Sequence, residues 1–228
     1  MADTVGYMRS KRAAPGIAWA VVAILAVAGV GVYLRVAGGG PLPLDEAWRE
    51  AVRLTPGSAA FTVAAFLAEI GSSFGVIACS VVACALLLTR HFATEAAALA
   101  TALVLGVTLS ELTKHLVERP RPFDALYTWD GYSYPSGHSM GAAALAVSVA
   151  YAITSVFRRG ATFVNRSSVT WAWIAAVCWI LAMMWSRTAL GVHWLSDTLA
   201  GALLGIATAV IAQRLWQRRS HRRSHRAQ

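Results

Sequence analysis

Long apolar stretches alternate with short polar ones along most of this 228-residue chain. A helix needs about 20 apolar residues to cross a hydrocarbon core roughly 30 Å thick. Six stretches approach that length, and we expect spans at residues 17–37, 72–88, 94–112, 136–156, 169–185 and 194–215. The pattern therefore predicts an all-α, polytopic membrane bundle of six transmembrane helices.

Two shorter segments interrupt this series. Residues 44–54 mix five charged side chains with apolar residues at three- to four-residue steps, which favours a short helix in the membrane interface. A solvated loop is the alternative. Residues 59–70 precede a cluster of glycine and serine, so we expect a short dipping helix there, ahead of the second span.

Composition agrees with a membrane domain. The chain is 57% hydrophobic and 14% charged, whereas a soluble domain carries roughly a quarter charged residues. We expect an N-terminal segment at 1–16, one membrane domain at 17–215 and a polybasic tail at 216–228. A cleaved signal peptide is the alternative for the first span, but its apolar region would usually be about 7–15 residues.

The charge distribution predicts the orientation. The net charge of +9 does not indicate a nucleic-acid partner, because the basic residues flank apolar spans and do not alternate with aromatics. Six spans place 13 of the 20 Lys and Arg residues on one side, so the positive-inside rule predicts a cell-membrane protein with both termini in the cytoplasm. The other seven face outward: Arg35, Arg49, Arg53, Lys114, Arg119, Arg121 and Arg187.

The first outward motif closes the third span. Lys114 is expected on its last helical turn, and prolines at 120 and 122 fix the chain on either side of Arg121. Lysine as a point charge and arginine as a planar fork can converge on one anion. The alternative is a pair of cations that snorkel to the interface.

The second outward motif, Pro135 to Ser139, opens the fourth span. Ser136 is a plausible N-cap, and Gly137 allows close approach to N–H groups that bind anions at a helix start. His138 would lie beside that site, where it can donate a proton. An ordinary capped helix with an interfacial histidine is the alternative.

The third outward motif precedes and opens the sixth span. It contains Arg187, His193 and Asp197, and the last two are four residues apart, so they share a helix face and can touch. A carboxylate beside an imidazole fixes its tautomer and raises its basicity, as a histidine nucleophile or base requires. A structural His–Asp pair between helices is the alternative.

Together the motifs favour metal-free phosphoryl transfer through a covalent histidine. Cations and helix N–H groups offset charge on the phosphoryl oxygens. We expect no cofactor, because no acidic cluster suits Mg²⁺ and no Cys/His set suits Zn²⁺. The three cysteines lie inside apolar runs and are interpreted as packing groups.

The same residues resemble the signature motifs of the type 2 phosphatidic acid phosphatase superfamily, which includes lipid phosphate phosphatases, glucose-6-phosphatase and vanadium haloperoxidases. The resemblance implies that His193 attacks phosphorus, Asp197 orients it and His138 protonates the leaving oxygen. It also implies a set of phosphate-binding residues: Lys114, Arg121, Ser136, Gly137 and Arg187.

We therefore expect a phosphatase that acts on a lipid phosphate among membrane lipids, with its site at the extracytoplasmic face. Polyprenyl diphosphate comes first among the expected substrates, followed by phosphatidylglycerophosphate and phosphatidate. The sequence leaves the oligomeric state open. A phosphotransferase with the same phosphohistidine, a vanadate-dependent peroxidase, and a transporter or structural bundle are the alternatives.

Three further positions carry narrower predictions. Glu111 can pair with Lys114 three residues later or remain a helix-end carboxylate. Glu69 is interpreted as a buried, hydrogen-bonded glutamate, with a lateral contact to substrate as the alternative. Gly201 and Gly205 form a GxxxG pattern that favours close helix packing inside the bundle over dimerisation.

Overall fold

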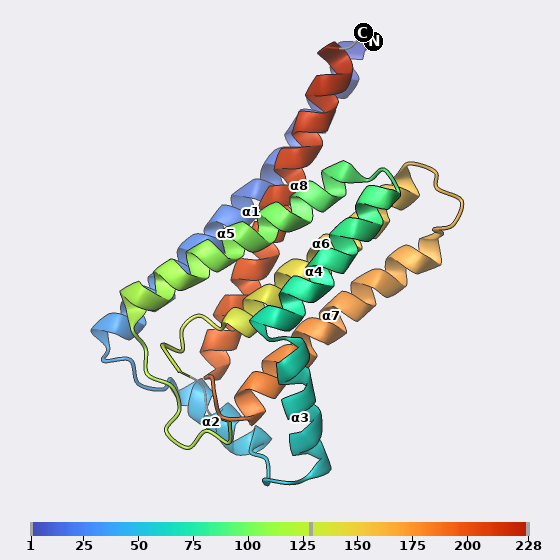
Figure 1. Ribbon diagram of the computed structural model, residues 1–228. Coiled ribbons are helices and arrows are strands. Elements are labelled where there is room, and N and C mark those ends of the chain that lie inside the picture. The colour runs from blue at the N-terminus through green and yellow to red at the C-terminus, as the bar shows by residue number, and fades with distance from the viewer. Residues whose placement is uncertain (1, 128–129, 227–228) are drawn as a thin grey trace.

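The structure is a computed structural model that describes residues 2–127 and 130–226, with side chains from 16 to 127 and 130 to 220. The described part is all-helical, which confirms the predicted fold class (Figure 1). Its helices are α1 (Ala2–Val36), α2 (Pro43–Val52), α3 (Ala59–Ile70), α4 (Ser73–Thr89), α5 (Ala93–Val117), α6 (Gly137–Arg158), α7 (Arg166–Ala189) and α8 (Leu195–Arg226).

Five of the described helices are long and apolar enough to cross a membrane: α1 from Gly16, α5, α6, α7 and α8 up to Ser220. Helices α3 and α4 pass the same test only together, and they are bent by 57° at the break between them. Ser72 caps α4 by accepting a hydrogen bond from the backbone N–H of Gly75 at 3.2 Å. The break lies where the sequence predicts it, while a total of six spans stays a prediction.

The first and last helices extend beyond the ends of the predicted transmembrane spans. The apolar pattern predicts boundaries near 17 and 215, but α1 begins at Ala2 and α8 continues to Arg226. The reason is that lipid contact requires apolar side chains, whereas arginine and glutamine are good helix formers in water. Helix α2 lies close to the predicted 44–54, and its placement in a membrane interface stays a prediction.

Helices α6 and α8 pack closely through glycine. A Cβ atom at Gly201 would lie 2.3 Å from the carbonyl oxygen of Ser136, and one at Gly205 would lie 2.3 Å from that of Met140. The GxxxG prediction of packing inside the bundle is therefore confirmed. This contact holds the start of α8 against the start of α6, where the second and third motifs lie.

The polar motifs gather at one end of the bundle. The ends of α5 and α7 and the starts of α6 and α8 meet there, and α2 packs against α7 and α8, while both chain termini lie at the opposite end (Figure 1). At the motif end, Arg35 of α1 pairs with Glu118 beyond α5 at 2.6 Å. Which side of the membrane this end faces stays a prediction.

Candidate active site

Lys114 lies on the last turn of α5 and faces the start of α6. Its Nζ donates a hydrogen bond to Glu111 Oε1 at 2.7 Å, so of the two alternatives for Glu111 the pairing with Lys114 forms. The same Nζ lies 3.5 Å from the position that a Cβ atom of Gly137 would occupy. The glycine therefore leaves the space between the ammonium group and the first turn of α6 free of a side chain.

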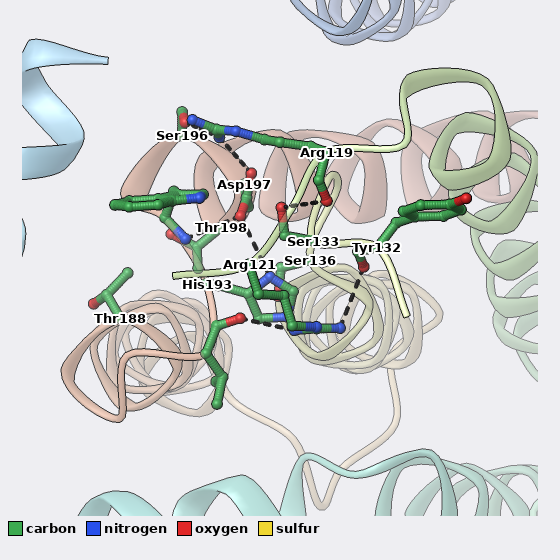
Figure 2. Close-up of polar contacts among 12 residues, drawn as sticks. Arg119, Arg121, Tyr132, Ser133, Ser136, Thr188, His193, Ser196, Asp197 and Thr198 are labelled. Carbon is green, nitrogen blue, oxygen red and sulfur yellow. Dashed lines mark hydrogen bonds and ion pairs between the residues drawn. The ribbon is translucent and has the colours of Figure 1, made fainter. Parts of the chain in front are cut away.

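Arg121 is held by backbone carbonyls beside His193. Its Nε donates to the carbonyl oxygen of Gly131 at 2.9 Å, and its Nη1 donates to that of Val192 at 2.7 Å. Nη1 also lies 3.1 Å from Nε2 of His193 (Figure 2). These contacts fix the guanidinium plane before any anion arrives, so little side-chain freedom is left to lose on binding.

The second motif begins helix α6 as the sequence predicts. Ser136 is the N-cap, and its hydroxyl accepts a hydrogen bond from the backbone N–H of Ser139 at 3.4 Å. The backbone N–H of Ser136 donates to the carbonyl oxygen of Asp197 at 2.9 Å, which joins this motif to the third. His138 is buried on the first turn, directly after Gly137.

The third motif differs from its prediction in one respect. We expected His193 and Asp197 to share a helix face, but α8 begins at Leu195, so His193 lies in the turn before it. Asp197 caps that turn, because its Oδ2 accepts a hydrogen bond from the backbone N–H of Trp194 at 2.9 Å. The same Oδ2 lies 3.5 Å from Nδ1 of His193, so the predicted proximity survives with a different local geometry.

The turn before α8 depends on Gly191, which has a φ of +68°. A side chain in that backbone region is strained, and here it would also meet Ala125 Cα at 3.3 Å. The turn closes because the backbone N–H groups of Val192 and His193 both donate to the carbonyl oxygen of Arg187. This closure holds the end of α7 next to the backbone of His193.

His193 is 3% exposed and stands among cations. Burial holds the pKa of its imidazole well below 6.5, and the charges of Arg121, Arg187 and Lys114 add to that effect. Arginine can only donate, so the contact from Arg121 requires a lone pair on Nε2 and leaves the proton on Nδ1, towards Asp197. A neutral imidazole with an unprotonated Nε2 beside three cations is suited to attack an anionic phosphorus group.

Arg187 lies fully buried on the last turn of α7. Its neighbours tie this turn to two other helices: the Ser186 hydroxyl donates to the carbonyl oxygen of Ala64 in α3 at 2.6 Å, and Trp48 of α2 donates to the Thr188 hydroxyl at 2.9 Å. We call Lys114, Arg121 and Arg187, which are expected to bind phosphate, the phosphate cradle. The structure thus brings together the cations that the sequence singled out.

Arg119 is a site residue that the sequence analysis did not single out. Its side chain is fully buried, and its Nη1 donates to Asp197 Oδ1 at 2.6 Å (Figure 2). Its Nη2 donates to Asp45 Oδ2 of α2 at 2.8 Å. No spacing rule links Asp45 with Arg119, because the contact joins segments far apart in the chain.

The interpretation of Glu69 as a buried glutamate is wrong. Its side chain is exposed near the end of α3, where it accepts a hydrogen bond from the Tyr127 hydroxyl. The break after Ile70 ends the helix there and leaves the carboxylate at an open edge, so an apolar sequence context did not imply burial.

A family model described as the PAP2 superfamily matches residues 95–221, more than half of the chain. This protein belongs to the PAP2 superfamily. The match begins at the start of α5 and includes all three motifs, so the family resemblance seen in the sequence is confirmed.

Two curated relatives of this PAP2 protein are informative. An undecaprenyl-diphosphatase from Sulfolobus acidocaldarius is 31% identical over 109 residues, which are 45% of this chain and 46% of that protein. Phosphatidylglycerophosphatase B from Bacillus subtilis is 35% identical over 99 residues, 43% of this chain and 46% of that protein. The chain therefore matches less than half the length of either relative.

Two crystal structures share the PAP2 fold. The PAP2-type phosphatidylglycerolphosphate phosphatase from Bacillus subtilis superposes with a TM-score of 0.71 at 24% identity, over 85% of this chain and 93% of that one. LpxE from Aquifex aeolicus superposes with a TM-score of 0.58 at 18% identity, over 75% and 95%. The similarity extends beyond the matched sequence segments to most of the bundle.

The donor set of this PAP2 site is suited to anions rather than metal ions. Among the described residues, no three His, Cys, Asp or Glu side chains come together in a way that could hold a metal ion. The cradle instead presents ammonium and guanidinium groups around two histidines. A metal-free reaction stays a prediction.

Proposed function

We propose that this protein is an integral-membrane lipid phosphatase that hydrolyses a phosphomonoester or diphosphate headgroup through a phosphohistidine at His193, without a metal. The observation that carries the proposal is the 3.1 Å contact between Arg121 Nη1 and His193 Nε2. It places a fixed guanidinium beside the lone pair of a buried, neutral imidazole. An anion bound by that guanidinium lies within reach of the nucleophile.

In the first step, the Nε2 lone pair forms a bond to phosphorus while the bond from phosphorus to the leaving oxygen breaks. His138 gives its proton to that oxygen, and Asp197 stabilises the positive charge that develops on the His193 ring. The phosphate cradle and the N–H groups at the start of α6 offset the charge on the equatorial oxygens.

In the second step, His138 takes a proton from water as the water oxygen attacks phosphorus. The bond between phosphorus and Nε2 breaks, its electron pair returns to the ring, and inorganic phosphate leaves. The cradle contacts the same equatorial oxygens in both steps, so one set of cations serves both transition states.

Two features support a lipid substrate on the extracytoplasmic side. The motifs lie at the end of the bundle opposite the chain termini, which the positive-inside rule assigns to the cytoplasm. The relatives are named for undecaprenyl diphosphate and phosphatidylglycerophosphate. We propose a polyprenyl diphosphate as the first substrate to test, followed by phosphatidylglycerophosphate and phosphatidate.

The test uses the purified full chain in detergent and a panel of these three lipids, with released phosphate as the readout. We expect turnover of at least one lipid, its loss in His193→Ala, and unchanged turnover in EDTA. A folded wild-type protein that releases no phosphate from any of them would contradict the proposal. Activity that disappears in EDTA and returns with Mg²⁺ would contradict its metal-free form.

A further inference from the structure

Arg119 is a buried cation shared by two buried carboxylates from different helices. Its guanidinium lies 2.6 Å from Asp197 Oδ1 and 2.8 Å from Asp45 Oδ2, and all three side chains are at most 1% exposed. Nη1 also donates to the Ser196 hydroxyl at 2.7 Å. Burying a charge costs desolvation free energy unless the charge is paired, so the stability of each of these three groups depends on the other two.

Asp45 ties these three groups to the start of α8. Its Oδ1 accepts the backbone N–H of Ser196 at 2.8 Å, and its Oδ2 accepts the Ser196 hydroxyl at 2.8 Å. Burial alone would raise the pKa of the Asp45 carboxyl, but the hydrogen bonds from Ser196 and Arg119 outweigh it and lower the pKa. Asp45 is therefore an ionised carboxylate on α2 that caps the helix carrying Asp197.

We propose that Asp45 is a positioning residue for the nucleophile: acting through Arg119, it keeps the carboxylate of Asp197 aimed at Nδ1 of His193. The inference rests on the proposed function, because it assigns Asp45 a part in the same reaction. It also gives α2, which lies outside the matched residues 95–221, a role in the site.

The contacts of Asp197 explain how the effect is transmitted. Arg119 holds Oδ1 and the backbone N–H of Trp194 holds Oδ2, so the carboxylate plane is set from both sides. Two carboxylates that share one guanidinium leave a net negative charge, which faces the imidazolium that forms during attack. Removing the charge of Asp45 leaves Arg119 to neutralise Asp197 alone, and the imidazolium loses that stabilisation.

The same geometry predicts which kinetic constant changes. The contacts that hold Lys114 and Arg121 do not involve Asp45: Lys114 pairs with Glu111, and Arg121 is held by backbone carbonyls. We therefore expect Asp45→Asn to lower kcat about tenfold and to leave KM within about twofold, because an interaction made only in the transition state is lost.

A double-mutant cycle distinguishes positioning from general stability. If Asp45 acts through Asp197, then adding Asp45→Asn to Asp197→Asn should lower kcat by less than about twofold, since linked residues are not additive. Single-turnover phosphate release with enzyme in excess makes the slow variants measurable. An equal loss in both backgrounds would show a merely structural role and overturn the inference.

Asp124→Asn is the matched control. Asp124 also holds α2 through an arginine, Arg49, but neither residue contacts Asp197. We expect kcat of Asp124→Asn to stay within about twofold of wild type. A loss as large as that of Asp45→Asn would show that any loosening of α2 slows the reaction, and would overturn the inference.

Ser196→Ala provides a second variant if Asp45→Asn does not fold. It removes only the hydroxyl that bridges Arg119 and Asp45. A loss of kcat in the wild-type background that is absent in Asp197→Asn supports the inference, and no loss or an equal loss overturns it. An inactive wild-type protein overturns the proposed function itself, whereas an active wild type with an unaffected Asp45→Asn overturns only this inference.

Discussion

Replacing Gly201 by alanine perturbs a close contact between α8 and α6. The new Cβ atom would stand 2.3 Å from the carbonyl oxygen of Ser136, and ordinary contact begins at 3.4 Å. The obstructing atom is backbone, so the two helices must separate by about 1 Å locally. Forced overpacking of this kind costs roughly 1–3 kcal/mol.

The same displacement affects catalysis, because Ser136 caps the helix that carries His138 and hydrogen-bonds to Asp197. A misplacement of about 1 Å can lower the rate about a hundredfold. We therefore expect Gly201→Ala to lose several degrees of thermal stability and most of its phosphate release. Gly205→Ala meets Met140 deeper in the bundle, so it should lose similar stability with a smaller loss of kcat.

Gly29→Ala is the control for this prediction. Nothing lies within 4 Å of the position that its Cβ would take, so alanine should be neutral or slightly stabilising in α1. Thermal unfolding and phosphate release are measured for all three variants in the same detergent. A Gly201→Ala protein with wild-type stability and wild-type activity would refute the close packing of α6 and α8.

Three further predictions follow from the electrostatics of the site. His138→Ala should slow release of the lipid alcohol from a phosphomonoester about 10²–10⁴-fold but slow the first-turnover release of p-nitrophenol from p-nitrophenyl phosphate much less, because a good leaving group needs no proton in the first step; equal losses in that step would contradict its role as general acid. Below pH 6.5 the imidazole of His193 is protonated in the unfolded chain but stays neutral in the folded protein. The thermal stability should therefore decrease as the pH is lowered, and it should decrease less steeply in His193→Asn. Parallel profiles of stability against pH for the two proteins would contradict a depressed pKa. Arg187→Lys should raise KM about tenfold, because a point charge replaces a planar fork; an unchanged KM would place Arg187 outside the cradle.

The apolar pattern and the motifs predicted the helical bundle and the positions of most candidate site residues, because both depend on local rules. The length of each apolar stretch locates the helices, and Ser136 marks the start of α6 because serine is a preferred N-cap residue. The position of Lys114 on the last turn of α5 follows from the same reasoning, whereas Arg187 was expected beyond the end of the fifth span and lies on the last turn of α7 because that helix continues to Ala189.

The remainder depends on contacts between distant segments. Asp45 lies among the charged residues of a short amphipathic helix, where a solvated face is the ordinary expectation, yet it is 1% exposed because Arg119 and Ser196 meet it there. His193 was expected at the start of a helix but lies in the turn before it, because the periodicity of the apolar residues does not reveal a turn that depends on Gly191. Tertiary hydrogen bonds decide both outcomes, and a single sequence carries no local signal for them.

The covalent intermediate on His193 is the central claim, and it can be trapped directly. His138→Ala protein is mixed with p-nitrophenyl phosphate, quenched in alkali to preserve the bond from phosphorus to nitrogen, and digested for mass spectrometry. The account predicts phosphate on the peptide that contains His193, and none in the His193→Ala/His138→Ala protein. Sustained turnover with no phosphopeptide, or with phosphate on a different residue, would contradict it.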